Sequence, residues 1–138
     1  MIAIIDYGAG NIFSVKNALD YLGVENKLTA DKNEICAADE IILPGVGAFP
    51  WAMKMLRDSG LVDTIREEAR KKPFLGICLG MQLIFDKGYE FEETDGLRLI
   101  GGKVEKIDRK DMIIPHMGWN ELEINRDCPI LKGLPEQI

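Results

Sequence analysis

A cysteine set between two glycines is the feature of this chain that points most clearly to chemistry. Cys78 lies in Gly76-Ile77-Cys78-Leu79-Gly80, which has the G-x-C-x-G spacing of a nucleophile elbow with sulfur in place of oxygen. An apolar run, Phe74 to Ile77, precedes the cysteine, and a helix-like stretch, Leu79 to Phe85, follows it. The pattern predicts a strand, a sharp turn and a helix, with the thiol exposed at the turn.

A thiol at the first turn of a helix is well placed for nucleophilic attack. The unpaired N–H groups and the macrodipole of a helix N-terminus favour the thiolate, which is the attacking form. The alternative interpretation of Cys78 is a buried structural cysteine, the commoner fate of a lone thiol. The flanking glycines and the strand–helix context favour the nucleophile.

Three other segments join the elbow in resembling a known family. Gly76-Ile77-Cys78-Leu79-Gly80-Met81-Gln82 looks like the nucleophile motif of triad-type (class I) glutamine amidotransferases. Within that class, the set of segments resembles the glutaminase subunits of imidazole glycerol phosphate synthases, a family of histidine biosynthesis. The elbow alone fits any class I amidotransferase, whereas the last segment is much more selective. The other segments are Asp6-Tyr7-Gly8-Ala9-Gly10-Asn11-Ile12, Leu43-Pro44-Gly45-Val46-Gly47-Ala48-Phe49 and Pro115-His116-Met117-Gly118-Trp119-Asn120.

The resemblance implies a definite reaction and partner. Cys78 would attack the side-chain amide of glutamine, giving a glutamyl thioester and ammonia, and water would then release glutamate. The ammonia would pass to a cyclase subunit, a (β/α)8 barrel, within a cytoplasmic heterodimer. The reaction as implied uses no metal and no other cofactor.

Attack on an amide creates an oxyanion that needs N–H donors already in place. The N–H of Leu79, directly after the nucleophile, is the natural first donor. Gly45-Val46-Gly47 follows a predicted strand end, where open α/β sheets place ligands. In the resembled family this segment is the oxyanion strand, in which one peptide must reorient, so the N–H of Val46 is the candidate second donor. The alternative is that Pro44-Gly45 simply turns the chain.

The resemblance assigns three residues to the substrate glutamine: Gly47, Gln82 and Glu90. Gln82 follows Cys78 by four residues, so it returns to the same face of the predicted helix. Glu90 occupies the position that the family uses to bind the amino group of glutamine. The alternatives are an ordinary helix amide for Gln82 and a solvated acidic run for Glu90, because the acidic residues Glu92, Glu93 and Asp95 follow closely.

Five residues are expected to face the partner: Asn11, His116, Met117, Trp119 and Asn120. His116 is the chain's single histidine and therefore a tempting general base, but its motif lies outside the triad in the resembled family. A hydrogen-bonded structural role is the simpler interpretation of that histidine. Trp119 fits an interface anchor or a core aromatic. Asn11 fits a cap of the first helix or a partner contact.

The resemblance covers essentially all of the chain but only about the first two thirds of the family's usual subunit. The family carries its triad His and Glu as a His-x-Glu pair near the C-terminus, whereas the 138 residues contain one His. We therefore expect the C-terminal third of the domain to be absent together with both groups. The chain as printed is expected to be inactive as a glutaminase.

Composition excludes several other classes of protein. The net charge of −6 argues against non-specific binding of nucleic acid. The longest apolar stretch, Phe74 to Phe85, is too short to span a membrane, and no signal peptide is visible. Cys36, Cys78 and Cys128 with one His supply too few ligands for a zinc site at plausible spacing. A reducing cytoplasm suits these features.

Strand and helix signals alternate along most of the chain. We predict one glutamine amidotransferase type-1 domain over residues 1–138. Its fold class would be α/β: a flavodoxin-like, open, mainly parallel sheet with helices on both faces, incomplete at the C-terminus. Residues 87–96 read as a polar loop before a more antiparallel region. The expected strands are 2–5, 26–29, 40–43, 74–77, 103–107 and 121–124, and the expected helices are 12–22, 33–38, 51–57, 61–71 and 79–85.

Three alternative functions remain open from the sequence. The first is a nucleotide- or flavin-binding module, because Gly8-Ala9-Gly10 follows the first strand, although Phe13 replaces the third glycine of G-x-G-x-x-G and no Walker A lysine exists. The second is another class I amidotransferase, which the Pro115 to Asn120 motif argues against. The third is a non-catalytic fragment that keeps the fold and the partner surface.

Overall fold

The computed structural model describes residues 1–108, 110, 113–115, 118–121 and 129–133. The chain forms two compact units, Met1–Lys106 and Ile107–Ile138. The described part of the second unit contains a 3-10 turn, η1 (Pro129–Leu131). A single domain over residues 1–138 stays a prediction.

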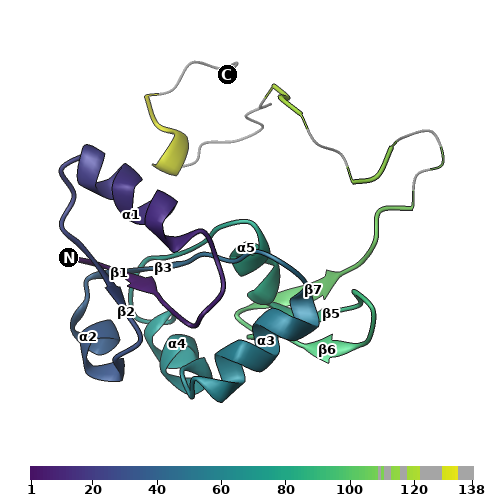
Figure 1. The fold of residues 1–138 in the computed structure, drawn as a ribbon, viewed down its shortest axis with the longest axis horizontal. Helices are drawn as coiled ribbons and strands as arrows, with labels where there is room; N and C mark the ends of the chain where they lie inside the picture. Colours follow the sequence, from purple (N-terminus) through teal and green to yellow (C-terminus); the bar gives the residue numbers. More distant parts are fainter. Residues whose placement is uncertain (109, 111–112, 116–117, 122–128, 134–138) are drawn as a thin grey trace. The chain divides into compact units, whose positions relative to one another are not determined.

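A four-stranded parallel sheet organises the first unit, in the order β2-β1-β3-β4 (Figure 1). Three strands have the predicted bounds: β1 (Ile2–Ile5), β2 (Asn26–Thr29) and β3 (Glu40–Leu43). The fourth, β4 (Phe74–Gly76), is one residue shorter than predicted. Because β1 and β3 are buried on both faces, they are almost wholly apolar, as parallel strands require.

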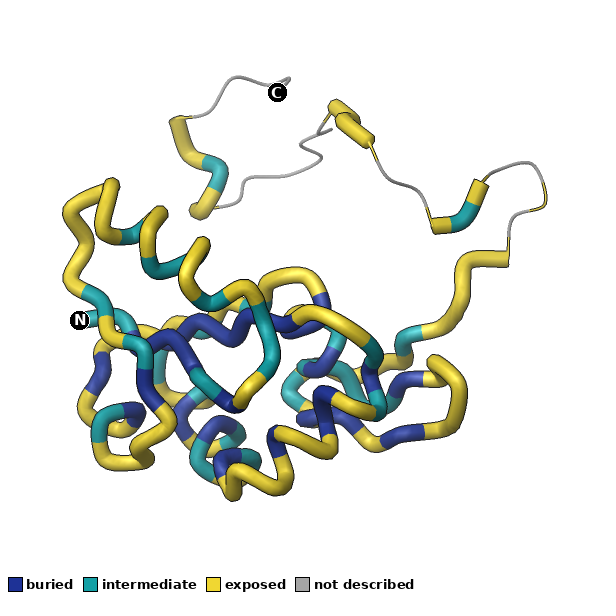
Figure 2. The backbone as a smooth tube through the Cα atoms, viewed as in Figure 1, coloured by how far each residue is buried: buried dark blue, intermediate teal, exposed yellow. Residues whose placement is uncertain are grey.

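Helices cover both faces of this sheet, which confirms the predicted fold class. α1 (Ile12–Tyr21) lies on one face, and α2 (Lys32–Ala37), α3 (Phe49–Asp58) and α4 (Val62–Glu68) lie on the other (Figure 1). α1 contributes no buried residue, whereas α3 buries Phe49, Ala52, Met53 and Leu56 at helical spacing. The main core therefore lies between the sheet and the helices α2, α3 and α4, where the buried segments of Figure 2 gather.

The strand order creates a switch point between β1 and β3. The chain passes from β1 to β2 on one side and then crosses to β3 on the other, so the loops after β1 and β3 leave the sheet in opposite directions. Ile4 of β1 is in register with Ile42 of β3, so the carboxyl ends of the two strands lie together. Open α/β sheets place ligands at this point.

The region after Cys78 differs from the prediction. The helix α5 (Leu79–Leu83) ends two residues earlier than expected, because Phe85 begins β5 (Phe85–Gly88). β5 pairs in antiparallel fashion with β6 (Thr94–Asp95) and in parallel with β7 (Ile100–Val104). Residues 87–96 are therefore not a simple loop, and the predicted strand 103–107 lies three residues too late. The strand predicted at 121–124 falls largely outside the described residues.

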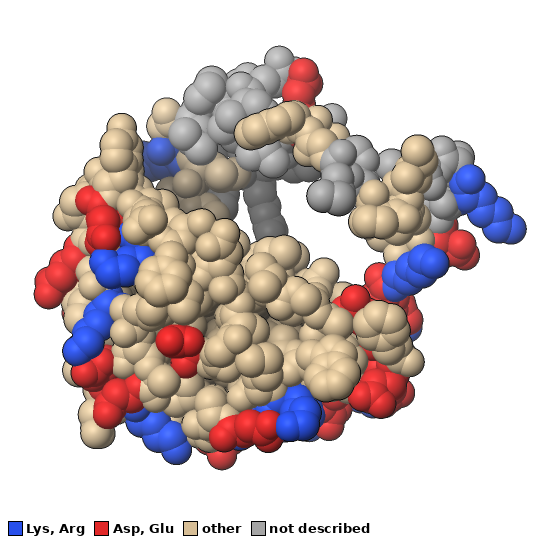
Figure 3. All heavy atoms as spheres, viewed as in Figure 1, with Lys and Arg blue, Asp and Glu red and all other residues tan. Residues whose placement is uncertain are grey.

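Charged side chains of both signs alternate on the surface rather than forming one field. On the face of Figure 3, they gather mostly around the edge, and the middle is largely uncharged. Many are paired one helical turn apart, as in Lys16–Asp20 and Lys54–Asp58. Among the described residues, no helix is long and apolar enough to cross a membrane.

Candidate active site

Cys78 lies at the sharp turn between β4 and α5, as the elbow pattern predicts. Its backbone has φ 55° and ψ −119°, a conformation that residues with a side chain rarely adopt. The Cys78 carbonyl begins the helix by accepting from the N–H groups of Met81 at 3.0 Å and Gln82 at 3.2 Å. The free thiol is exposed. Strained backbone of this kind collects at functional sites, where surrounding structure holds it in place.

The two glycines of the motif are required by backbone packing. A Cβ at Gly76 would lie 2.6 Å from Cα of Met81, and a Cβ at Gly80 would lie 1.9 Å from the carbonyl oxygen of Leu43. The same Leu43 oxygen accepts a hydrogen bond from the N–H of Ile77 at 3.0 Å. The end of β3 therefore holds both sides of the elbow, and only glycine allows this approach.

The predicted oxyanion segment touches the elbow directly. Gly45 is buried, and a Cβ built on it would lie 2.6 Å from N of Gly80 and 3.0 Å from Cβ of Leu79. Beyond it, Val46 is exposed, and Gly47 has φ 96° with open space around it. The structure thus brings together two of the predicted segments, 43–49 and 76–82.

The two candidate oxyanion donors are backbone groups outside the helical hydrogen bonds of this region. The N–H groups of Gly80, Met81 and Gln82 all donate to the carbonyls of Ile77 or Cys78, whereas that of Leu79 does not. The first N–H groups of any helix lack intrahelical partners, so Leu79 presents one beside the thiol. The N–H of Val46 takes part in no hydrogen bond with the described residues.

Tyr7 is a residue of this site that sequence reasoning missed. Its buried hydroxyl donates to the carbonyl oxygen of Pro44 at 3.0 Å, directly before Gly45. Burial raises the pKa of Tyr7 to about 12, so the hydroxyl keeps its proton at neutral pH. The signal in the sequence was its place in the loop that follows β1, because loops after neighbouring parallel strands meet at one edge of the sheet.

Glu90 also has a partner that the sequence did not indicate. One oxygen of its carboxylate, Oε2, accepts from the N–H of Phe49 at 2.8 Å, at the first residue of α3. The acidic residues that follow behave as an ordinary charged surface: Glu93 pairs with Lys87, and Asp95 pairs with Arg98 at 3.0 Å. Glu90 is therefore distinguished from its acidic neighbours by a contact 41 positions away in the sequence.

The glycine loop after β1 packs against the oxyanion segment instead of standing open. A Cβ on Gly10 would lie 3.3 Å from Cβ of Pro44, and the N–H of Gly8 donates to the carboxylate of Asp6 at 3.1 Å. A phosphate-binding loop needs backbone N–H groups that face free space. This contact disfavours the nucleotide-binding alternative for the loop.

The predicted partner residues are only partly described. Asn11 is the N-cap residue of α1, exposed, and its side chain makes no capping hydrogen bond. Trp119 and Asn120 are exposed, and the choice between an interface anchor and a core aromatic for Trp119 stays open. His116 and Met117 lie outside the described residues. The assignment of all five residues to a partner stays a prediction.

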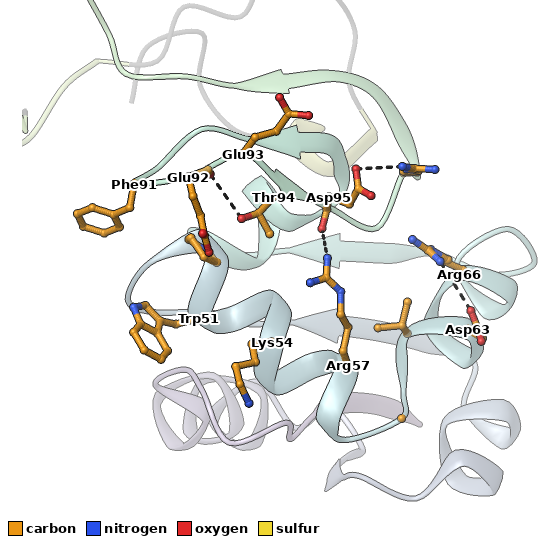
Figure 4. A pocket seen from close by; sticks show the side chains of 14 residues that line it. Trp51, Lys54, Arg57, Asp63, Arg66, Phe91, Glu92, Glu93, Thr94 and Asp95 are labelled. Atoms are coloured by element: carbon orange, nitrogen blue, oxygen red, sulfur yellow. Dashed lines mark hydrogen bonds and ion pairs between the residues drawn. The ribbon is translucent and has the colours of Figure 1, made fainter.

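A broad groove lies along α3 (Figure 4), and Cys78 is not among the residues that line it. It encloses about 1440 Å³, larger than the roughly 300–1,000 Å³ of ordinary small-molecule sites. Its cations are engaged: Arg57 donates to the Asp95 carbonyl at 2.6 Å, and Arg66 donates to the carbonyls of Gly96 and Leu97. These hydrogen bonds hold α3 and α4 to the β6 region. The arginines that line the groove therefore have a structural role, and no ligand is needed to explain them. No metal-binding group of His, Cys, Asp and Glu side chains occurs among the described residues.

Comparison with known proteins finds relatives that match almost the whole chain. The chain is 51% identical over 136 residues to the imidazole glycerol phosphate synthase subunit HisH of Listeria monocytogenes serotype 4a (strain HCC23), covering 97% of this chain and 65% of that protein. It is 52% identical over 135 residues to the subunit HisH of Bacillus cereus (strain G9842), covering 97% of this chain and 64% of that protein. The chain therefore spans about two thirds of the length of these relatives.

Solved structures show the same fold. A crystal structure of a glutamine amidotransferase superposes with a TM-score of 0.64 at 24% identity, over 80% of this chain and 60% of that one. A putative peptidase E protein from Listeria monocytogenes EGD-e superposes with a TM-score of 0.55 at 20% identity, over 72% of this chain and 62% of that one. The model of the family glutamine amidotransferase class-I matches residues 3–138. With that match over nearly its whole length, the chain belongs to the class-I glutamine amidotransferases.

Proposed function

We propose that this chain provides the nucleophile and the oxyanion donors of a glutaminase subunit of imidazole glycerol phosphate synthase. The observation that carries the proposal is the exposed thiol of Cys78, held at φ 55° beside the Gly45–Gly47 segment. Relatives at about half identity are named as that subunit. The substrate would be L-glutamine and the product passed on would be ammonia.

The chemistry follows from the residues at the elbow. The sulfur of Cys78 attacks the carboxamide carbon of glutamine, and the carbonyl electron pair moves onto oxygen. The N–H groups of Leu79 and Val46 stabilise that oxyanion. Collapse of the intermediate breaks the C–N bond once the nitrogen has received a proton, so ammonia leaves and a thioester remains. Water then attacks the thioester and releases glutamate and the thiol.

The second oxyanion donor requires a movable peptide, which the loop provides. Gly47 already has a positive φ, and nothing lies within 4 Å of the place where its Cβ would be. Val46 is exposed by 53%. Both observations support rotation of the peptide between these residues, as glycine permits.

Substrate contacts are proposed for Gly47, Gln82 and Glu90. Gln82 is half-buried on α5 and follows Cys78 by four residues, about one helical turn. A carboxylate such as that of Glu90 is a suitable partner for the ammonium group of glutamine. The other carboxylate oxygen of Glu90, Oε1, makes no hydrogen bond or ion pair with the described residues, so it remains available for that contact.

The proposed partner is a cyclase subunit, a (β/α)8 barrel, in a cytoplasmic heterodimer. The support is the Pro115 to Asn120 motif together with the complete exposure of Trp119, because exposed tryptophans are frequent anchors of interfaces. We propose that His116 belongs to this surface and is not the general base. The base and its carboxylate would then come from outside residues 1–138, and the chain alone would turn over glutamine near background.

A fusion protein tests the proposed function. The printed chain is joined to the part of the Listeria monocytogenes relative that lies beyond its match, and glutamate release is measured with cyclase and its nucleotide ligand. We expect turnover by the fusion and none by its Cys78→Ser variant. Its His116→Ala variant should still release glutamate, reduced only as far as coupling to cyclase is weakened. Proton transfer by a positioned side chain is worth about 10²–10⁴ in rate, so the unfused chain should stay near background. Robust turnover by the unfused chain that His116→Ala abolishes would reverse the assignment of His116.

A further inference from the structure

The segment that follows β3 is fastened at both of its ends by side chains from distant parts of the chain. At one end the hydroxyl of Tyr7 donates to the Pro44 carbonyl at 3.0 Å. At the other end the carboxylate of Glu90 accepts from the Phe49 N–H at 2.8 Å. Between these two points lie Gly45 to Ala48, which include the proposed oxyanion donor.

The hydrogen bond from Phe49 to Glu90 satisfies a backbone donor that the helix leaves unpaired. The N-cap residue of α3 is Ala48, whose methyl group cannot accept a hydrogen bond, and the second helical residue is Pro50, which has no N–H. The N–H of Phe49 is thus an orphan donor at the start of a ten-residue helix. A carboxylate is the strongest acceptor for such a donor, because the helix dipole adds to the hydrogen bond.

The hydrogen bond from Tyr7 to the Pro44 carbonyl is buried, and close packing around it prevents both groups from moving. Tyr7 is only 5% exposed, and its hydroxyl lies 3.0 Å from the place that a Cβ on Gly45 would occupy. Gly45 is in turn packed on Gly80 of the elbow. Between the two ends, Val46 and Gly47 are exposed, and nothing lies within 4 Å of the place that a Cβ on Gly47 would occupy, so motion of the segment would be confined to these two residues.

We propose that Tyr7 and Glu90 are positioning residues that clamp the two ends of the oxyanion segment, so that only the Val46–Gly47 peptide rotates. Glu90 then has two tasks on its two oxygens. Oε2 holds the N–H of Phe49, and Oε1 receives the ammonium group of the substrate. Binding of the amino acid is thereby linked to the segment that stabilises the oxyanion. The substrate part of this inference rests on the proposed function, whereas the clamp does not.

Conservative variants separate the two tasks of Glu90. Glu90→Gln keeps a side-chain oxygen that can accept from Phe49 but loses the charge that an ammonium group needs. Glu90→Ala loses both. Tyr7→Phe removes only the hydroxyl. Glu92→Ala and Tyr89→Phe are the matched controls, because neither side chain forms a hydrogen bond or ion pair with the described residues.

The reagent is a chloroketone analogue of glutamine, which alkylates the thiol of Cys78 in the printed chain and gives a saturation constant KI and a limiting rate kinact. For Glu90→Gln we expect KI to rise at least tenfold with kinact kept within twofold. For Glu90→Ala we expect KI to rise and kinact to fall at least fivefold. For Tyr7→Phe we expect kinact to fall about fivefold with KI unchanged, the scale of one neutral hydrogen bond. Iodoacetamide, which has no amino group, should label all variants within twofold.

Amide hydrogen exchange measured by NMR tests the clamp without any substrate. The N–H of Phe49 should exchange at least tenfold faster in Glu90→Ala and within threefold of wild type in Glu90→Gln. Amides of Ile4 and Ile42 in the sheet, unchanged in every variant, show that the fold is intact. The clamp is refuted if Tyr7→Phe and Glu90→Ala both keep wild-type kinact, or if Glu90→Gln loses as much kinact as Glu90→Ala. If the wild-type chain shows no saturation with the analogue, the proposed glutamine site fails instead, and the exchange rates still decide the clamp.

Discussion

Replacing Gly80 with alanine tests whether contact between backbones builds the elbow. A Cβ at this position would lie 1.9 Å from the Leu43 oxygen, 2.8 Å from the Leu43 carbonyl carbon and 3.1 Å from the Pro44 carbonyl carbon. All three atoms belong to the main chain, so no side-chain rotation can relieve the overlap. α5 would have to move away from β3 by more than about 1 Å to restore an ordinary contact.

The expected free-energy change can be worked from these contacts. Overpacking typically costs about 1–3 kcal/mol, and a clash with backbone belongs at the upper end. The displacement also stretches the hydrogen bond from Ile77 to Leu43, worth about 1 kcal/mol. Alanine recovers up to about 1 kcal/mol of helix propensity. We expect Gly80→Ala to lower the free energy of unfolding by about 3 kcal/mol.

Urea unfolding followed by circular dichroism measures this change. With a slope of about 2 kcal/mol per molar urea, the midpoint should fall by about 1.5 M. The matched control is Gly101→Ala, where the nearest atom to the added Cβ is 3.9 Å away and φ is not in the left-handed region. Its midpoint should stay within about 0.3 M of wild type. Helix propensity alone predicts the opposite sign, so a midpoint for Gly80→Ala at or above that of wild type would refute the packing argument.

Three further predictions concern charge and partner contacts. Hydrogen bonds from Lys72 and Lys71 hold the pKa of Glu68 below its ordinary 4.5. The ionised carboxylate therefore stabilises the fold above about pH 4.5, and this stabilisation is lost as the pH falls further. The difference in urea midpoint between wild type and Glu68→Gln should close between pH 6 and pH 3. Burial raises the pKa of Tyr7 from 10.0 to about 12. As the pH rises from 9 to 12, the free energy of unfolding of wild type should therefore fall by about 1–2 kcal/mol relative to that of Tyr7→Phe, after allowance for solvent screening. Equal alkaline unfolding of both proteins would contradict this. In the fusion protein, Trp119→Ala should keep iodoacetamide labelling of Cys78 within twofold but reduce coupling to cyclase at least tenfold; lost labelling with intact coupling would refute the partner assignment.

Local signals determined much of the parallel sheet. The runs at 2–5, 26–29 and 40–43 match β1, β2 and β3 to the residue, because each is a short strand bounded by polar or turn residues. Gly23, with φ 69°, follows the C-cap residue Leu22, and α1 ends within one residue of the predicted bound. These features depend on residues that are neighbours in the chain, so the sequence contains the information.

The region after the elbow could not be predicted from local pattern. Leu79 to Phe85 reads as one helix, but Phe85 pairs with Ile100 of β7, and that pairing ends the helix early. Gly101 and Gly102 look like strand breakers, yet they lie within β7, where the N–H of Gly102 donates to the carboxylate of Asp86 at 2.9 Å. Pairing between segments about fifteen residues apart outweighed the local preference.

The sequence by itself predicted the sharp turn at Cys78, because Gly76, Cys78 and Gly80 are neighbours in one short segment. Only the tertiary structure decided which groups support it. Tyr7 reaches Pro44 across 37 positions, and Glu90 reaches Phe49 across 41. Nothing in the sequence around Tyr7 or Glu90 indicates these contacts, because Tyr7 simply follows a strand and Glu90 is one of four acidic residues. The contacts arise because parallel strands bring their following loops to one edge of the sheet, and burial there favours any polar group that finds a partner.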